Sequence, residues 1–205
     1  KDILVAEGDS VLAGETLFRI QNQYFISNRQ ENMIKLAAYK AKLIRIKALI
    51  NNQDTVNFEK EMVENISQII ENEVQIFYGE KKKHHSQVSV LQEQLLQKKA
   101  QLRELEVKLE NLSIEYNLAL ESLKIQEELS KKGAISRERY LQHFAAKQKI
   151  YTHMEETRYS IPVIRQEIEE WNKKIEGKLF EIKSELLQQS NEVHIEIKKL
   201  EEIIK

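Results

Sequence analysis

Cysteine is absent from this chain of 205 residues, and proline and glycine are scarce, with one and five copies. Without cysteine there is no disulfide, no thiolate nucleophile and no Cys-ligated zinc, although both a reducing cytosol and an oxidising periplasm remain possible. A compact domain of this size needs many turns, which use Gly and Pro. Their scarcity argues against a single globular core.

Two further features are missing. No run of about 18 apolar residues is present, and no basic segment followed by an apolar one opens the chain at Lys1. We therefore expect a fragment, for which the absence of a membrane anchor proves nothing. The 32 Lys and Arg and 33 Asp and Glu residues are interspersed and nearly cancel, whereas phosphate binding needs clustered positive charge. Nucleic acid is not an expected partner.

What remains is a chain with 32% charged and 41% apolar residues, dominated by Glu, Lys, Leu, Gln and Ile, which is typical of coiled coils. Residues 1–26 differ, because short apolar stretches alternate there with turn signals at Gly8-Asp9 and Gly14. The predicted fold class is mainly α: a long antiparallel coiled-coil hairpin of three helices with a small β segment at its base.

The periodicity predicts helices over about 28–50, 57–132 and 137–205. Ser27 or Asn28 is expected to cap the first helix and residues 51–54 to end it, while the sequence leaves open whether residues 77–86 interrupt the second. Lys98 alone breaks an apolar seam with steps of three and four. The seam positions are Leu91, Leu95, Lys98, Leu102, Leu105, Leu109, Leu112, Tyr116, Ala119 and Leu123.

Between the second and third helices lies a predicted tip of four residues, 133–136. Gly133 suits the left-handed position that ends a helix, and Ser136 suits the N-cap of the next one. The resulting hairpin register places Lys98 near Trp171. The first helix is expected to fold back along the base as a third helix, and Pro162 to kink the returning arm without breaking it.

Two stretches resemble a known family. Residues 5–20 contain Glu7, Gly8, Asp9 and Gly14 in an EGDxVxxG pattern, and residues 128–137 contain the GAIS tip. Both are similar to the HlyD-type membrane fusion proteins, the periplasmic adaptors of type I secretion systems. The resemblance implies that residues 1–26 are the first half of a lipoyl-like β-domain, split by the insertion of a hairpin domain over residues 27–205.

The resemblance also implies a function. The chain would belong to an adaptor in the periplasm, anchored to the inner membrane of a Gram-negative bacterium. Its partners would be an inner-membrane ABC transporter, a TolC-like outer-membrane channel and further copies of itself, as a hexamer. Leu129 and Ser136 keep the Leu-x6-Ser spacing of channel docking. The implied docking residues are Leu129, Lys132, Gly133, Ala134, Ile135, Ser136 and Arg137.

Several alternatives stay open. Related drug-efflux adaptors carry Arg four residues before the docking Leu, where this chain has Ile125, so the secretion branch is favoured over efflux. A cytosolic coiled-coil spacer, with a tip whose Gly133 and Ser136 serve only as caps, is the structural alternative. A metal site is not expected, since the His residues lack helical ligand spacing. We also predict no cofactor and no enzymatic activity, because a two-helix rod offers little concavity.

Overall fold

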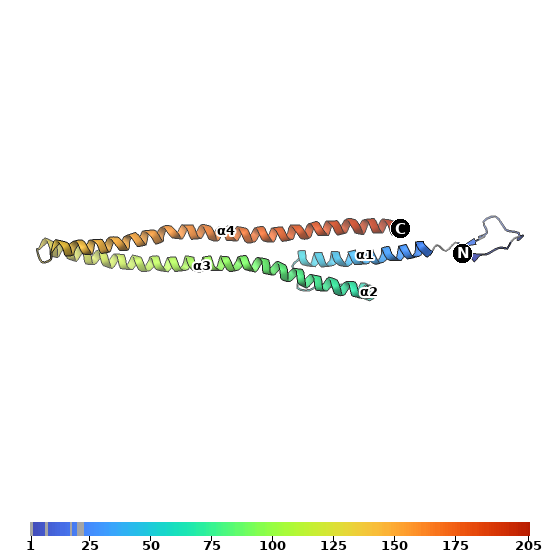
Figure 1. Cartoon of the computed structure of the whole chain (residues 1–205), viewed down its shortest axis with the longest axis horizontal. Coiled ribbons are helices and arrows are strands. Elements are labelled where there is room, and N and C mark those ends of the chain that lie inside the picture. The colour runs from blue at the N-terminus through green and yellow to red at the C-terminus, as the bar shows by residue number, and fades with distance from the viewer. Residues whose placement is uncertain (1, 7, 17, 20–22) are drawn as a thin grey trace. The chain divides into compact units, whose positions relative to one another are not determined.

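The structure of the chain, a computed structural model, describes residues 2–6, 8–16, 18–19 and 23–205. In chain order its elements are β1 (Asp2–Ile3), β2 (Phe18–Arg19), α1 (Gln23–Ile50), α2 (Lys60–Asn65), α3 (Ser67–Lys131) and α4 (Arg137–Ile204) (Figure 1). Most described residues are therefore helical. This confirms the mainly helical fold with a long helical hairpin.

The chain divides into two compact units. Unit 1 contains Lys1–Lys83 and Ile182–Lys205, and unit 2 contains His84–Glu181. α3 and α4 each contribute a part to both units, whereas α1 and α2 belong to unit 1 alone. The division of the chain into a β-domain and a hairpin domain near residue 26 stays a prediction.

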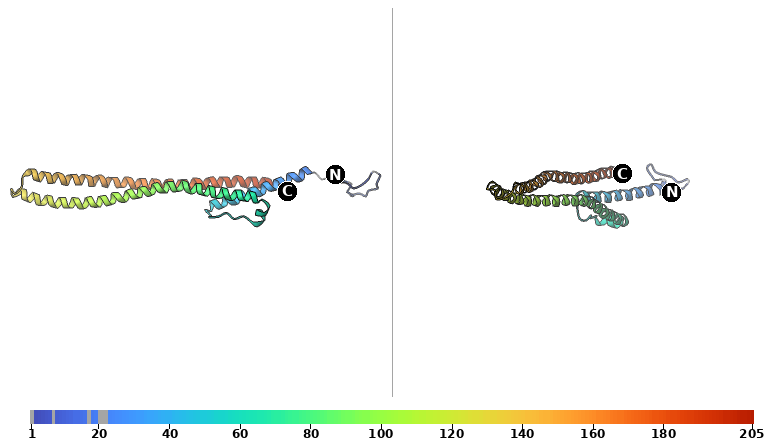
Figure 2. Two further views of the ribbon diagram at one scale, coloured as in Figure 1. Left: turned by 60° about the horizontal axis from the view of Figure 1, so that its bottom comes forward. Right: turned by 60° about the vertical axis from the view of Figure 1, so that its left-hand side comes forward.

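In unit 2, α3 and α4 lie side by side and are joined by the tip, the yellow turn in Figure 1 (see also Figure 2). All ten predicted seam positions on α3 are buried or half-buried. On α4, three large apolar residues, Phe144, Tyr151 and Leu179, are 44%, 39% and 51% exposed. Two helices shield a large side chain from one direction only, so residues at the margin of the seam stay in contact with water.

Polar and aromatic pairs fix the register of the two arms in unit 2. Lys98 Nζ lies 2.6 Å from Glu167 Oε2, and the Tyr116 and Tyr151 ring centroids are 5.6 Å apart. The tyrosine pair agrees with the register predicted from the tip to within two residues. The expected approach of Lys98 to Trp171 is wrong by one helical turn, because Lys98 pairs with a carboxylate that offsets its charge.

In unit 1, α1 begins earlier than predicted. Ser27 and Asn28 lie inside α1, which starts at Gln23, and Asn28 accepts a hydrogen bond from Asn32 one turn later. Neither Gly nor Pro occurs between Gln23 and Ile50, so nothing local stops the helix from extending. The predicted end is confirmed: Asn52, at φ +50°, donates to Leu49 O, and Gln53 donates to Ala48 O.

The second predicted helix is divided in two. α2 ends before Ile66, whose φ of −137° is not helical, and α3 restarts at Ser67. Neither Gly nor Pro marks this break. Instead, Ile66 and Ile70 are buried with Ala41 of α1, so the break serves packing against α1. α3 is then continuous through residues 77–86, and α4 continues through Pro162.

The core of unit 1 lies where α1, α3 and α4 meet. Phe77 and Ile46 are completely buried there. The buried members of the main cluster are Ile46, Ala48, Leu49, Val56, Phe77, Leu186, Val193 and Ile197. Lys40 of α1 also pairs with Glu201 of α4 at 3.0 Å. α1 therefore acts as a third helix of this unit.

A buried arginine, which the sequence pattern did not indicate, joins α1 to α3. Arg45 is 4% exposed, and its Nε donates to Glu73 Oε2 at 2.6 Å. The guanidinium also pairs with Glu80, and both carboxylates belong to α3. Removing one partner from such a cluster leaves a charge without compensation in a poorly hydrated place. The cluster thus favours one register of α1 on α3.

Candidate functional site

The tip of unit 2 ends α3 with a compact set of backbone hydrogen bonds. Gly133 has φ +71°, which a residue with a Cβ adopts only with strain. Its N–H donates to Ser130 O at 3.0 Å, and Ala134 N–H donates to Leu129 O at 2.9 Å. These two bonds form a Schellman motif, which satisfies carbonyls that the end of a helix leaves open. The predicted role of Gly133 is confirmed.

α4 begins with the cap that the sequence predicted. Ser136 Oγ accepts a hydrogen bond from the backbone N–H of Arg139 at 3.3 Å, and Ser136 O accepts from Tyr140 N–H. An N-cap hydroxyl that satisfies the third helical N–H is the usual start of a helix. Capping therefore accounts for Ser136 whether or not a partner binds at the tip.

Side-chain exposure varies along the tip. Ala134 is exposed, whereas Leu129 and Ile135, the two larger apolar residues, are half-buried against the hairpin. Lys132 and Arg137 are exposed, and neither makes an ion pair within the described part of the chain. The accessible surface is therefore a small apolar spot flanked by two cationic side chains.

The neighbouring Lys131 is occupied differently. Its Nζ lies 2.8 Å from Glu127 Oε1 one turn earlier on α3. The hydrogen bond from that carboxylate, together with its charge, raises the pKa of Lys131 above the ordinary lysine value. Lys131 therefore stays protonated and paired within α3.

The N-terminal segment holds the other predicted motif, in two turns of the same design. Gly8 and Gly14 have φ +100° and +94° at the third position of their turns, where type II turns require a positive φ. Asp9 N–H donates to Ala6 O, and Asp9 Oδ2 accepts from Ala6 N–H at 2.7 Å. In the second turn, Glu15 N–H donates to Leu12 O at 3.0 Å, and Glu15 Oε2 accepts from Leu12 N–H at 2.8 Å.

These turns lie between β1 and β2, which pair antiparallel with Asp2 opposite Arg19 and Ile3 opposite Phe18. Glu7, the first residue of the predicted motif, lies outside the described residues. For Gly8, Asp9 and Gly14 the structure explains why the motif needs these residue types. The carboxylates of Asp9 and Glu15 each accept a hydrogen bond from a backbone N–H within their own turn, so neither is directed at a ligand.

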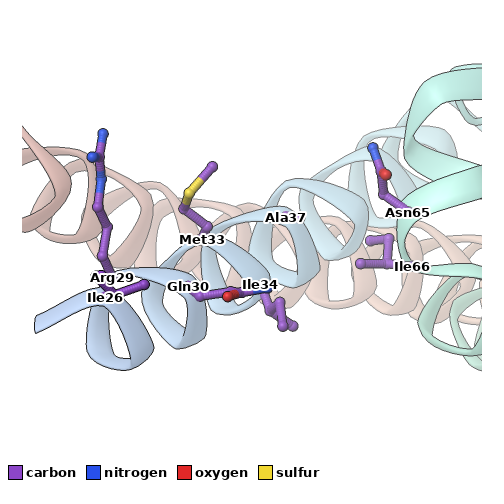
Figure 3. Close-up of a pocket in the computed structure, with 8 residues that line it drawn as sticks. All are labelled: Ile26, Arg29, Gln30, Met33, Ile34, Ala37, Asn65 and Ile66. Carbon is purple, nitrogen blue, oxygen red and sulfur yellow. The ribbon is translucent and has the colours of Figure 1, made fainter. Parts of the chain in front are cut away.

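A groove between α1 and α2 was not found from the sequence. It has a volume of about 630 Å³ and is open along one side (Figure 3). Ile26, Met33 and Ile34 of α1 are at least half exposed beside it. The residues that line it are Ile26, Arg29, Gln30, Met33, Ile34, Ala37, Asn65 and Ile66. The sequence pattern that could have revealed this groove is the helical spacing of Ile26, Met33 and Ala37, which are seven and four residues apart.

The family model "AprE, long alpha-helical hairpin" matches residues 26–205, which include every helix from α2 onward and nearly all of α1. The chain belongs to this AprE hairpin family. The family match confirms the resemblance to membrane fusion proteins that residues 5–20 and 128–137 indicated.

One solved structure has the same fold as this AprE-family chain. It is described as the "Crystal structure of the soluble domain of LipC, a membrane fusion protein of a type I secretion system". The two share 19% identity, the match covers 100% of this chain and 79% of that chain, and the TM-score is 0.87. No curated protein sequence matches this chain.

This AprE-family hairpin was also considered for a membrane span and a metal site through its described helices and side chains. Within the described residues, no helix combines the length and apolar character that crossing a bilayer requires. The same residues contain no group of three His, Asp or Glu side chains arranged to hold a metal ion. The tip and the N-terminal turns remain the two sites that the sequence singled out.

Proposed function

We propose that this chain is the hairpin part of a periplasmic adaptor, a membrane fusion protein of a type I secretion system. The observation that carries the proposal is the family match over residues 26–205. The LipC soluble domain, which is described as belonging to such a system, supports the same proposal through its fold. The adaptor would work through contact alone and would catalyse no reaction.

In this proposal the hairpin links an inner-membrane ABC exporter to a TolC-like outer-membrane channel. The tip residues Leu129, Lys132–Arg137 would meet the channel. The adaptor would lie in the periplasm, would be held to the inner membrane by a segment outside this chain, and would act as a hexamer. Exposed Ala134 between two unpaired cations supports a contact surface at the tip.

The N-terminal segment fits the first half of a lipoyl-like β-domain at the base of the hairpin. The paired β1 and β2 strands and the two glycine turns support this assignment. A covalent carrier of lipoate or biotin would place a lysine on a hairpin turn after this half. α1 begins there instead, so the segment would be structural.

The sharpest test uses Ala134→Arg in the full-length protein. Ala134 is exposed and its side chain takes no part in either cap, so the substitution adds bulk and charge without removing a structural contact. We expect lost crosslinking to the outer-membrane channel and lost secretion of the substrate, with unchanged helicity. Leu129→Asp and Ser136→Arg should act in the same direction, with an added loss of helix capping for Ser136→Arg.

A matched control carries Val90→Arg, an exposed position on the same arm away from the tip. It should secrete normally. Normal secretion by Ala134→Arg as well would reduce the tip to a capped turn and favour the spacer function. Lost export of small molecules with unchanged protein secretion would assign the chain to an efflux adaptor instead.

A further inference from the structure

The groove between α1 and α2 in unit 1 is an apolar surface that the proposed function does not use. Ile26, Met33 and Ile34 of α1 are 52%, 54% and 50% exposed beside it. Two turns further along α1, Ala41 is completely buried together with Ile70 of α3. The apolar face of α1 is therefore covered in its C-terminal half and open in its N-terminal half. An open apolar patch with a polar rim is typical of a binding site.

Polar side chains stand along the rim of this groove. They belong to Arg29, Gln30 and Asn65. Arg29 is exposed and makes no ion pair within the described part of the chain. Its side chain leaves α1 in the same direction as that of Met33, one turn further along (Figure 3). An apolar lining with a few polar groups is the usual construction of a small-molecule site, and a guanidinium is well suited to bind a carboxylate.

Charge differs between the two ends of the open face of α1. A second groove of about 440 Å³ continues the first and shares Met33 with it. Glu59 and Glu61 line the second groove, whereas Arg29 lines only the first. Lys40 also lines the second groove, but its charge is offset by an ion pair with α4. An anion is therefore attracted at the Arg29 end and repelled at the opposite end.

The size of the groove limits what can occupy it. Its volume of about 630 Å³ lies within the range of roughly 300–1,000 Å³ that is common for small-molecule sites. Three turns of an α-helix, with a diameter of about 10 Å, would occupy roughly 1,300 Å³. A helix from another protein is therefore too thick to enter, while a single alkyl chain can lie inside.

We propose that this groove binds a fatty acid. Its carboxylate pairs with Arg29, and its alkyl chain passes Met33 toward Ala37 and Ile66. Burial of the chain supplies most of the affinity, because each methylene removed from water adds a similar gain, whereas an ion pair at an exposed arginine adds less. The site lies within unit 1, so this inference goes beyond the docking and transport roles of the proposed function and requires neither.

Methionine methyl signals in NMR spectra test the site. Met33 lines the groove, whereas Met154 is buried in unit 2 and serves as the internal control. The full-length protein would be labelled with ¹³C at its methionine methyl groups and reconstituted in nanodiscs of zwitterionic lipid. The variants Met33→Leu and Met154→Leu assign the two signals. We expect decanoate to shift the Met33 signal to saturation and to leave the Met154 signal unchanged.

Two analogues separate the contributions of the carboxylate and the chain. Hexanoate keeps the carboxylate but lacks four methylenes, so its affinity should be lower by more than about tenfold. Decanamide keeps the chain without the charge and should bind about fivefold more weakly than decanoate. Equal affinities for hexanoate and decanoate would overturn the burial of the chain. Equal affinities for decanamide and decanoate would overturn the pairing with Arg29.

Variants of α1 test the same two contacts by calorimetry. Arg29→Gln should weaken decanoate binding about fivefold and leave decanamide binding unchanged. Met33→Asp places a negative charge in the groove and should abolish decanoate binding. The matched control is Asn28→Asp, which makes the same change in charge at an exposed position of α1 outside the groove. All three positions are exposed, so helicity should not change, and the control should bind decanoate normally.

Three outcomes would overturn the inference. A Met33 signal that does not respond to decanoate would show that the groove is not a fatty-acid site. Shifts of the Met33 and Met154 signals together would indicate an unspecific action on the fold. Equal loss of binding in Met33→Asp and Asn28→Asp would indicate general repulsion of the anion. None of these results depends on the tip variants, so this inference and the docking proposal can fail separately.

Discussion

The two units of this chain bury their apolar side chains with different numbers of helices. In unit 1 a third helix, α1, completes a core in which Phe77 and Ile46 are entirely buried. In unit 2 two helices share one seam, and among its described residues only Leu123, Met154, Thr157, Ile161 and Ile164 reach buried status. Two helices can cover each other on one side only. The comparison shows that α1 gives unit 1 an interior, whereas unit 2 keeps two faces available for other molecules.

Among variants that test this comparison, Phe77→Ala is expected to lose the most stability. Phe77 is 0% exposed, and the cavity left by a truncated buried phenylalanine costs about 3–5 kcal/mol. Chemical denaturation should show this loss in the free energy of unfolding, and hydrogen exchange should place it in unit 1. Phe180→Ala, at a side chain that is 76% exposed, is the control and should change stability by less than about 0.5 kcal/mol. A similar loss in both variants would contradict the contrast in burial.

Arg45→Met is expected to have the next largest effect. It leaves Glu73, which is 13% exposed, without its cation, and a broken buried ion pair costs about 3 kcal/mol or more. Adding Glu73→Gln should recover part of the loss, because it removes the unpaired charge. Denaturation of the single and double variants measures both effects. A double variant no more stable than Arg45→Met would mean that packing, not charge, makes Arg45 important.

The C-terminal ends of α1 and α3 both form a Schellman motif, which allows a matched comparison with a smaller expected effect on stability. Gly133 in unit 2 and Asn52 in unit 1 occupy the same left-handed position, at φ +71° and +50°. Gly133→Ala should cost about 1 kcal/mol, although a Cβ there meets open space, because the backbone angle is strained for alanine. Asn52→Gly should stabilise slightly. Thermal unfolding measures both, and a stable Gly133→Ala variant would argue against the left-handed turn.

The smallest effect concerns pH and the loop after α1. The hydrogen bond from Lys81, followed by its charge, lowers the pKa of Asp54 below the ordinary aspartate value. This pair therefore stabilises the fold fully above the ordinary pKa, and the contribution is lost as pH falls through the lowered one. An NMR titration should show the Asp54 carboxyl returning to its ordinary pKa in Lys81→Met. An unchanged titration would show that the pair does not form in solution.

The expectations drawn from the sequence held where short-range chemistry decides the structure. Gly133, Ser136 and the Asn51–Asp54 stretch end or begin helices through bonds to residues at most five positions away. The apolar seam of α3 could also be predicted from the sequence, since helical periodicity is a local property. The docking role of the tip and the lipoyl-like role of residues 1–26 came from resemblance, and both stay predictions.

The sequence by itself determined the helical hairpin and its tip, because caps and periodicity act within a few residues of the chain. Only the tertiary structure decided the break at Ile66, the burial of Arg45 and the exposure of Phe144 and Tyr151. Each of these depends on which helix lies opposite, and on how many sides of a residue are covered. Burial is a property of neighbours brought from distant parts of the chain, so no local pattern could specify it.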